Sequence, residues 1–384
     1  MAAFCRLCFA TRVCSDQIMM QLAIVGCGAV VEELYLPALK KVQRSGYMRV
    51  ASLVDTKVER LQRLGRAFPK AECYESLQEA YHSKKIDLTL ITSPPAFHAN
   101  GAEIAFAHGS HVLCEKPLAS SLQEAEQMTA QAERQGCLLA VGFTRRFFPN
   151  LCKARQLIEA DVLGGPLHFI MREGKVYNWP VASDAPFRRA TGGGVLLDVG
   201  AHAMDTLCWL FGQPVIRSFK DDALTSGVDA NCIAELEFSN ASGTLQLSWD
   251  QPLASGLTIR GTKAQLGIPA WGMHAWEWRE VNASWEKHVS DATFVDDLRT
   301  PAERFRRPED FYDCIRFQLI QVLRAVKYSE PLPVSGRAAL LSMRALQQCQ
   351  AIAEPLEQEW LTPSEQRAFR CAHWRSAGVF QHEP

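Results

Sequence analysis

The sequence predicts two domains: an α/β domain built on a parallel, doubly wound sheet, and an α+β domain with an open, mainly antiparallel sheet. Strands and helices alternate regularly from Gln21 to Val141, which is typical of parallel crossover units. Residues 231–249 instead alternate apolar and polar side chains around a polar turn, which indicates an antiparallel hairpin. A chain of 384 residues is also too long for one small core.

Composition narrows the class of protein. Hydrophobic residues make up 47% and charged residues 22%, as in ordinary globular chains, and the formal net charge of −1 gives no basic field for nucleic acid or an anionic membrane. The apolar runs are shorter than the ~18 residues needed to cross a bilayer, which predicts no membrane partner. The thirteen cysteines are scattered, and four lie inside apolar patterns typical of small buried side chains: Cys27, Cys114, Cys208 and Cys232. A reducing, cytoplasmic compartment is expected.

Four segments are expected along the chain. The N-terminal extension carries Arg6 and Arg12 with no acid before Asp16, which is similar to an organellar transit peptide, although Met19 or Met20 could equally be the start. The predicted boundaries are an extension at 1–19, the α/β domain at 20–142, the α+β domain at 143–355 with C-terminal helices packing back on the body, and a tail at 356–384.

The first strand leads into a glycine turn. After the apolar strand 21–25, Gly26 makes a tight turn, Gly28 lets the backbone approach phosphates, and a helix begins. The N-terminus of that helix, at Ala29 and Val30, offers free N–H groups and a positive dipole end to a pyrophosphate. Val31 stands where a third glycine or alanine is expected, so the dinucleotide fingerprint is incomplete.

An acid ends the second strand. Residues 48–55 form an apolar strand that ends at Asp55, about where a ribose 2′-hydroxyl is bound in this kind of domain. A carboxylate there favours NAD over NADP because it repels a 2′-phosphate. Lys57 leaves NADP as an alternative.

Two later strands end in loops at the same edge. The strand 87–92 runs into Ser93, Pro94 and Pro95, with His98 at the start of the next helix. The strand 111–114 is followed by Glu115, Lys116 and Pro117, and the proline restricts the backbone beside the lysine. Ligands bind at the carboxyl edge of such sheets, so these side chains are expected near the dinucleotide.

The organising segment of the second domain is a glycine run followed by a helix. Three glycines, 192–194, precede an apolar periodic segment that begins at Val195. Asp198 and His202 are four residues apart and therefore share one helix face. An imidazole titrates near neutrality, and an adjacent carboxylate can orient it, so the pair suits acid/base chemistry. The alternative is a surface pair without catalytic role, or a structural histidine whose hydrogen bonds are satisfied.

The remaining elements complete the α+β domain. Helices are expected at 150–161, 310–328 and 335–353, and strands at 167–171, 231–238, 244–249 and 257–266. The segment 271–285 is rich in tryptophan, and such residues more often pack a sheet or an interface than bind a sugar.

These motifs, taken in order, resemble the glucose-fructose oxidoreductase and inositol dehydrogenase family, often written Gfo/Idh/MocA. The quoted stretches are Gly26-Cys-Gly28, Ser93-Pro94-Pro95 with His98, Glu115-Lys116-Pro117, Gly142-Phe-Thr-Arg145-Arg146, and Gly192-Gly-Gly-Val-Leu-Leu-Asp198-x-x-x-His202-x-x-Asp205. The resemblance covers about residues 20 to 355.

The resemblance implies a Rossmann domain with NAD, or NADP, and hydride transfer to or from a secondary alcohol of a sugar, cyclitol or related polyol. Lys116, Asp198 and His202 would be catalytic, with His202 as the base and Asp198 as its orienting partner or a substrate ligand. Cofactor contacts are expected from Gly26, Gly28, Ala29, Val30, Asp55, Ser93, Pro94, His98, Glu115 and Lys116. Substrate contacts are expected from Arg145, Tyr177, Asn178 and Arg188. The second sheet would join a homo-oligomer, and no cluster has metal-ligand spacing.

Two alternatives stay open at this point. The same cofactor and base could run a redox-cycled elimination whose net result is glycoside hydrolysis. A dinucleotide sensor or scaffold without catalysis is the second alternative, which Val31 favours and the retention of Lys116, Asp198 and His202 disfavours.

Overall fold

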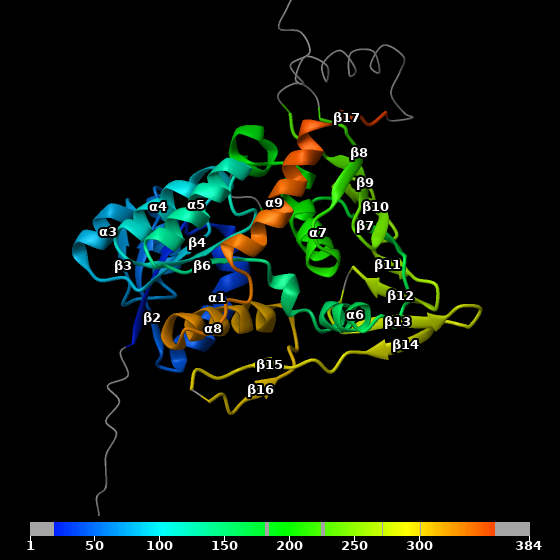
Figure 1. The fold of residues 1–384 in the computed structure, drawn as a ribbon. Helices are drawn as coiled ribbons and strands as arrows, with labels where there is room; N and C mark the ends of the chain where they lie inside the picture. Colours follow the sequence, from blue (N-terminus) through cyan, green and yellow to red (C-terminus); the bar gives the residue numbers. More distant parts are fainter. Residues whose placement is uncertain (1–18, 181–183, 224–226, 271, 300, 358–384) are drawn as a thin grey trace, which may run out of the picture.

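The computed structural model describes residues 19–180, 184–223, 227–270, 272–299 and 301–357. The predictions for residues 1–18 and 358–384 lie outside these ranges. Two sheets stand apart, and long helices lie between them (Figure 1). This arrangement leaves the carboxyl edge of the first sheet facing the helix that begins after the glycine run.

The first sheet has six parallel strands in the order β3-β2-β1-β4-β5-β6. This order confirms the predicted dinucleotide-binding architecture. The strand order reverses at β1, because β2 and β3 lie on one side of it and β4, β5 and β6 on the other. The strands are nearly continuous apolar runs because helices cover both faces. Their bounds are β1 (Met20–Val25), β2 (Met48–Val54), β3 (Glu72–Tyr74), β4 (Leu88–Ile91), β5 (His111–Cys114) and β6 (Leu139–Val141).

The helices of this domain begin where the sequence supplies caps. Ser76 and Ser121 accept hydrogen bonds from the N–H of Glu79 (3.3 Å) and Glu124 (3.2 Å), and Ser121 with Glu124 forms a full capping box. The bounds are η1 (Val30–Tyr35), α1 (Leu36–Arg44), α2 (Val58–Gly65), α3 (Leu77–Ser83), η2 (Pro95–Phe97), α4 (His98–Ala107) and α5 (Leu122–Arg134).

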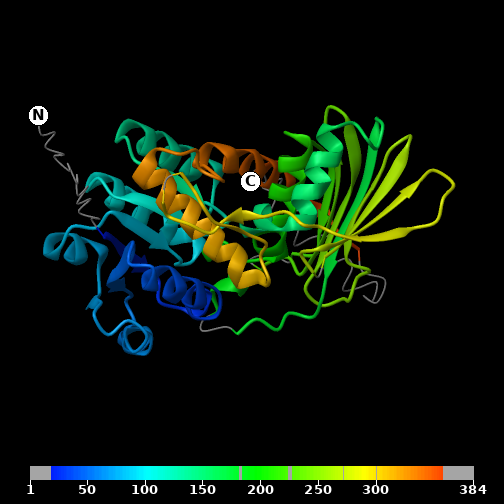
Figure 2. The same cartoon turned by 90° about the horizontal axis from the view of Figure 1, so that it is seen from below.

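The second sheet has nine strands in the order β14-β13-β12-β11-β7-β10-β9-β8-β17. All neighbours are antiparallel except β10 with β7 and β17 with β8, which confirms a mainly antiparallel sheet. The bounds are β7 (Leu167–Gly174), β8 (Val215–Asp221), β9 (Asn231–Glu237), β10 (Ala241–Ser248), β11 (Gly256–Arg260), β12 (Ala264–Pro269), β13 (Ala275–Glu280), β14 (Glu286–Val289) and β17 (Glu354–Pro355). Figure 2 shows the sheet fanning out from the helices on one side only.

Helix α7 (Val195–Phe211) is the core of this domain and packs on β9 and β10, with α6 (Pro149–Glu159) beside it. Gly200 faces the sheet, because a Cβ there would lie 2.9 Å from Leu247 Cδ1. The helical segment Arg189–Phe211 contains an 18-residue window with a mean hydropathy of 1.2, which is long and apolar enough to cross a membrane by composition alone. However, 72% of that window is buried inside the protein, as in a core helix.

The C-terminal helices return to the first domain. Helix α8 (Phe311–Tyr328) packs on α1, and α9 (Gly336–Ala351) packs between α5 and α7 (Figure 1). The N–H of Val141 donates to the backbone oxygen of Val334 at 3.0 Å, a normal hydrogen-bond length. A short ribbon of β15 (Phe294–Val295) and β16 (Phe305–Arg306) precedes α8 and contacts it.

Candidate active site

The candidate site lies where the carboxyl ends of the first sheet meet α7. Strands β1, β2, β4 and β5 end immediately before Gly26, Asp55, the Ser93 loop and the Glu115–Lys116 pair. Because all four strands are parallel, these groups share one edge. A hydrogen bond from Lys116 Nζ to Asp198 Oδ1 joins this edge to α7.

The glycine turn is built for close approach. Gly26 has φ +90°, and a Cβ there would lie 2.6 Å from Ser93 N, so only glycine fits against the β4 loop. Gly28 differs, because a Cβ there would meet nothing within 4 Å. The open space beside Gly28 is where a pyrophosphate would need to approach the backbone.

Two observations show that a dinucleotide fits this edge. Ser93 Oγ is buried and has no hydrogen-bond partner among the described residues, so a ligand oxygen or N–H would satisfy it. Val31, which replaces the expected third small residue, is fully buried in the hydrophobic core and points away from the open space beside Gly28. The helix opens with the π-helical segment η1, which accommodates this valine.

Asp55 braces the turn. Its Oδ2 accepts the N–H of Cys27 at 2.8 Å, and its Oδ1 accepts the N–H of Lys57 at 2.8 Å. Arg60 Nη1 lies 3.7 Å from Oδ2. The carboxylate therefore ties the glycine turn to the start of α2, and a further ribose contact stays a prediction.

His98 and Glu115, both predicted to contact the cofactor, are buried side chains. The His98 side chain is completely buried, with ring nitrogens 2.7 Å from Ser93 O and 3.1 Å from Pro117 O. Glu115 is also buried, and its Oε1 accepts the hydroxyl of Tyr35 at 2.5 Å. Both side chains hold the loops at this edge in place, and a direct contact of either one with the cofactor stays a prediction.

Lys116 and Asp198 form the central ion pair. Lys116 Nζ donates to Asp198 Oδ1 at 2.7 Å and to the backbone oxygen of the same residue at 3.1 Å. The lysine side chain is 15% exposed and the aspartate side chain 42% exposed. The expected Asp198–His202 orienting contact is therefore replaced by a contact that joins the two domains.

His202 lies one turn further along α7 on the same face. Its Nδ1 is buried and has no hydrogen-bond partner within the described ranges, and the Phe143 ring stands edge-on at 6.1 Å between centroids. Burial, followed by the charges of Lys116 and Arg145, lowers the pKa of His202 well below its usual value. The imidazole is thus neutral near pH 7 and able to accept a proton.

The loop after β6 contains η3 (Thr144–Phe147) and supplies two arginines that pair with acids of β7 and α7. Arg145 makes a two-pronged ion pair with Glu173 of β7, including Nη2 to Oε2 at 2.7 Å. Arg146 grips Asp205 of α7 with bonds of 2.6 and 3.0 Å. Arg145, predicted to bind substrate, is held by Glu173 and acts on His202 through its charge.

Tyr177 is the aromatic residue at the site. Its ring packs on Trp249 and Phe187 at centroid distances of 4.8 and 5.2 Å. Burial and then the charge of Asp198 raise the pKa of Tyr177 to about 12, which keeps the hydroxyl protonated. A contact of Tyr177 with substrate stays a prediction.

The other two predicted substrate residues are not brought to the ion pair. Asn178 is exposed, and it follows Tyr177 in an extended segment, where successive side chains point to opposite sides. Arg188 is exposed between η4 (Ala185–Phe187) and η5 (Arg189–Thr191) and pairs with Asp184. Their assignment to substrate stays a prediction.

No sequence motif points to Asp229, yet it fixes the start of α7. Its Oδ2 accepts the N–H of Leu196 at 2.7 Å, and its backbone oxygen accepts the N–H of Val195 at 2.8 Å. Gly194, at φ +110°, has no room for a Cβ beside this carboxylate. Burial raises the pKa of Asp229 to about 7, with Asp221 contributing. Asp229 therefore caps α7 by accepting hydrogen bonds from its first N–H groups, and only glycine fits beside this carboxylate at position 194.

Metal ligands are sparse. In the part of the chain that the structure describes, no three His, Cys, Asp or Glu side chains are grouped to hold a metal ion. The four cysteines predicted to be buried, Cys27, Cys114, Cys208 and Cys232, are buried free thiols. Cys5 and Cys8 have Cys-x-x-Cys spacing and lie outside the described residues.

A parallel-sheet dinucleotide domain whose lysine loop meets an Asp-x-x-x-His helix from an antiparallel-sheet domain defines a class of nicotinamide-binding oxidoreductase folds. Comparison with known families places the chain in that class. Residues 20–143 match the oxidoreductase family with an NAD-binding Rossmann fold, and residues 151–267 match the GFO/IDH/MocA C-terminal domain. The chain belongs to the Gfo/Idh/MocA family.

Curated relatives match over part of their length. The rhizopine catabolism protein MocA of Rhizobium meliloti is 31% identical over 193 residues, which are 50% of this chain and 57% of MocA. The D-glucoside 3-dehydrogenase of Escherichia coli is 28% identical over 207 residues, 52% of this chain and 56% of the relative. The chain thus spans little more than half the length of these relatives.

Solved structures share the whole fold. KijD10, a 3-ketoreductase from Actinomadura kijaniata in complex with NADP and TDP-benzene, has a TM-score of 0.72 at 18% identity, with 88% of this chain and 99% of that chain covered. The WlbA dehydrogenase from Bordetella pertussis, in complex with NADH and UDP-GlcNAcA, gives a TM-score of 0.72 at 19% identity and the same coverage. At these identities the likeness establishes the fold.

Proposed function

We propose that this protein is an NAD(P)-dependent oxidoreductase that transfers hydride between nicotinamide and a secondary alcohol of a sugar, cyclitol or related polyol. The observation that carries the proposal is the 2.7 Å contact of Lys116 Nζ with Asp198 Oδ1, with His202 one turn along the same helix face. The relatives named D-glucoside 3-dehydrogenase and scyllo-inositol 2-dehydrogenase (NADP(+)) support the substrate class.

Lys116 is the group that polarises the reacting oxygen. An ammonium has three N–H donors, and Asp198 takes two of them. The third donor is directed to the substrate oxygen, whose negative charge grows in one direction of the reaction and falls in the other. A cation fixed in advance stabilises that charge without reorganising.

His202 is the general base. Its lowered pKa keeps the imidazole neutral at physiological pH, so it can take the hydroxyl proton of an alcohol. Since Nδ1 is buried, the proton is accepted at Nε2. Asp198 and Tyr177 bind neighbouring hydroxyls, because the half-exposed carboxylate accepts hydrogen bonds and the protonated phenol donates them.

When bound, the dinucleotide supplies the hydride donor or acceptor. Backbone groups from Gly26 to Val30 would hold its pyrophosphate, and Ser93 would meet it from the β4 loop. The carboxylate of Asp55 favours NAD, whereas the nearby guanidinium of Arg60 would suit the 2′-phosphate of NADP. The alternatives of glycoside hydrolysis and of a sensor draw no support from a specific contact.

We propose a homo-oligomer formed through the outer face of the second sheet. Apolar side chains are exposed on β7 and β14, at Ile170 and Val289. Trp276 and Trp278 instead pack against the core, so the tryptophan-rich segment serves mainly the sheet itself. Light scattering on the Ile170→Glu variant should show a smaller assembly than on Val58→Glu, which charges an exposed valine of α2.

The dinucleotide claim is tested by titrating the protein with NADH and NADPH and following nicotinamide fluorescence. The Gly28→Val variant is the sharpest probe, since its side chain enters open space and the fold should keep its melting temperature. We expect the wild type to bind NADH or NADPH and the Gly28→Val variant to lose this binding. Equal binding by the two proteins, or no binding of either dinucleotide to a wild type that carries none after purification, would reject the proposal.

A further inference from the structure

A cavity lies at the edge of the first sheet opposite to the candidate active site. It has a volume of about 410 Å³ and is lined by the last turn of α1, by α8 and by the ribbon that contains β15 and β16. Tyr47, which lines it, immediately precedes β2 and accepts the N–H of Met20 at the start of β1. The cavity is therefore at the amino ends of the strands, whereas the candidate active site is at their carboxyl ends.

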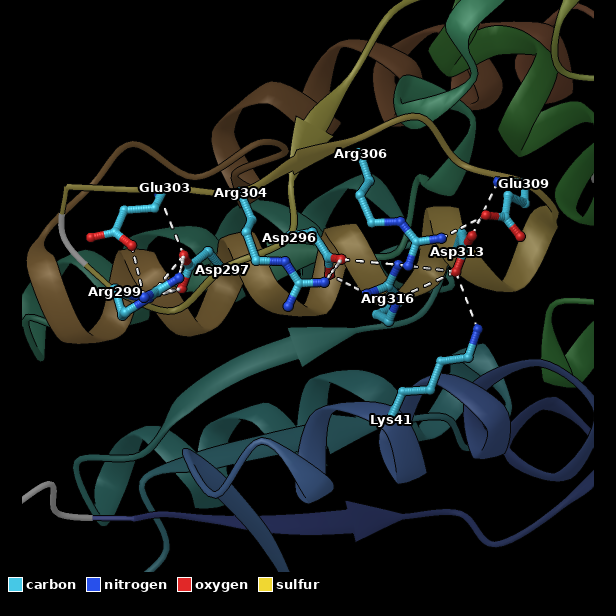
Figure 3. Close-up of polar contacts among 10 residues, drawn as sticks. All are labelled: Lys41, Asp296, Asp297, Arg299, Glu303, Arg304, Arg306, Glu309, Asp313 and Arg316. Carbon is cyan, nitrogen blue, oxygen red and sulfur yellow. Dashed lines mark hydrogen bonds and ion pairs between the residues drawn. The ribbon is translucent and has the colours of Figure 1, made fainter.

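Cations outnumber anions on its wall. Four basic side chains, Lys41, Arg299, Arg304 and Arg316, face two carboxylates, Asp296 and Asp297 (Figure 3). Asp297 is fully occupied, because it accepts bonds from Arg299 and from the N–H of Arg299 and Glu303, and these hold its pKa well below the usual range. Two more acids beside the wall, Asp313 and Glu303, pair with Lys41 and Arg299. The cations differ from the wall's carboxylates in exposure: Lys41, Arg299 and Arg304 are 50%, 49% and 60% exposed, whereas Asp296 and Asp297 are 3% and 6% exposed.

The other carboxylate is shared. Asp296 is paired closely with Arg316, and Arg304 lies 3.5 Å from its second oxygen. Lys41 reaches from α1 to Asp313 of α8 at 3.3 Å, and Asp313 also accepts from Arg316 Nε at 3.2 Å (Figure 3). Lys41 and Arg304 therefore hold long contacts to carboxylates that Arg316 already occupies, and both are at least half exposed.

One buried donor is left without a good acceptor. The Arg316 side chain is 9% exposed, and its Nη2 makes no hydrogen bond within the described residues, although Asp313 Oδ1 lies 3.1 Å away in poor alignment. The Arg316 guanidinium lies between Asp296 and Asp313 on the wall of the cavity and adds a positive charge there.

We propose that this cavity binds the phosphate group of a small molecule, with Lys41 and Arg304 at the mouth and Arg316 at the back. Arginine forks match the spacing of phosphate oxygens, and lysine adds a point charge. The ligand would bridge α1 of the first domain with α8 and the β15–β16 ribbon, so binding should raise the melting temperature. The proposal concerns a site separate from the candidate active site and stands without the proposed function.

The test is calorimetric titration of the full chain with inorganic phosphate, and separately with glycerol 3-phosphate, at constant ionic strength. The Lys41→Ala/Arg304→Ala double variant should raise the Kd by about tenfold or more, since two charge-assisted contacts are lost. The matched control is Lys40→Ala/Arg337→Ala, which removes the same charge from α1 and from an exposed pair on α9.

The control should bind as the wild type does. Tighter binding of glycerol 3-phosphate would identify the source as a phosphate ester, and equal binding would identify free phosphate. The same Kd in both double variants, or no heat with either probe in a wild type that melts cooperatively, would overturn the proposal. A melting curve of each variant shows that the fold is retained.

Discussion

The two ends of the polar face of α7 carry ion pairs of opposite character. At the outer end, Asp198 is 42% exposed and pairs with a lysine whose donors are not all used. Two turns deeper, Asp205 is 1% exposed and is gripped by both arms of Arg146. The same helix thus presents one carboxylate to a ligand and uses another to fix itself to the loop after β6. Exposure and spare hydrogen-bond capacity, more than residue type, separate the reactive pair from the structural one.

The inner pair should give the largest effect on stability. Asp205→Ala leaves the Arg146 guanidinium nearly buried without its partner, which costs about 3–5 kcal/mol in the free energy of unfolding. Urea denaturation measures this loss. The double variant Arg146→Met/Asp205→Leu, which removes both charges, should recover most of it. A change below about 1 kcal/mol for Asp205→Ala would place this pair in the class of exposed ion pairs.

The outer pair should affect activity instead. Lys116→Ala should lower kcat by about 10²–10³-fold, because the cation facing the developing charge is removed, while NADH binding is retained. Lys263→Ala is a matched control, since Lys263 Nζ also contacts both a side-chain and a backbone oxygen of one aspartate, Asp161. Steady-state rates that fall equally in the two variants would break the distinction between a reactive pair and a structural one.

The start of α7 should be intermediate. Gly194→Ala places a side chain at a positive φ and against the Asp229 carboxylate, and a strained position of this kind costs about 1–3 kcal/mol. The same substitution at Gly65 meets only Cys73 Sγ at 3.8 Å and should be tolerated. Thermal melts of the two variants compare them directly, and an unchanged melting temperature in Gly194→Ala would remove the reason given for the third glycine.

The smallest effect is a slope of stability with pH. The pKa of Asp229 is raised to about 7 in the folded state, so between about pH 4 and pH 7 the folded protein holds a proton that the unfolded chain has lost. Stability due to this residue therefore falls as the pH rises through that window. In Asp229→Asn this part of the slope should vanish, as measured by urea denaturation from pH 4.5 to 8. Parallel curves for the two proteins would contradict the raised pKa.

Much of the fold could be predicted because its signals are local. The apolar strands β1, β2, β4 and β5, the serine caps and the period-two strands β9 and β10 are all visible in short windows of sequence. Of the strands that were missed, β8 has seven residues of alternating burial, whereas three others are short. β3 has three residues with no buried member, and β15 and β16 have two residues each, so pairing with distant neighbours is what makes them strands.

The candidate site divides in the same way. Lys116, Asp198 and His202 stand in recognisable motifs, whereas their partners depend on contacts across the fold. Asp198 pairs with a lysine 82 residues away instead of the histidine four residues away. Asp229 caps a helix that begins 34 residues earlier in the chain, and Tyr35 meets Glu115 across 80 residues. Sequence spacing predicts which side chains share a helix face, but tertiary packing decides which of them touch.

In the proposed reaction, hydride passes between a polyol carbon and the nicotinamide, while Lys116, paired with Asp198, polarises the reacting oxygen and His202 takes the hydroxyl proton. The most direct measurement is absorbance at the nicotinamide band with NAD or NADP and a panel of sugars and cyclitols, run in parallel on the wild type, Lys116→Ala and Lys263→Ala. We expect the wild type to reduce NAD or NADP with at least one sugar or cyclitol of the panel. The Lys263→Ala variant should keep this activity, and Lys116→Ala should lose it. Reduction at the same rate in all three proteins, or no reduction by a wild type that binds the dinucleotide, would contradict it.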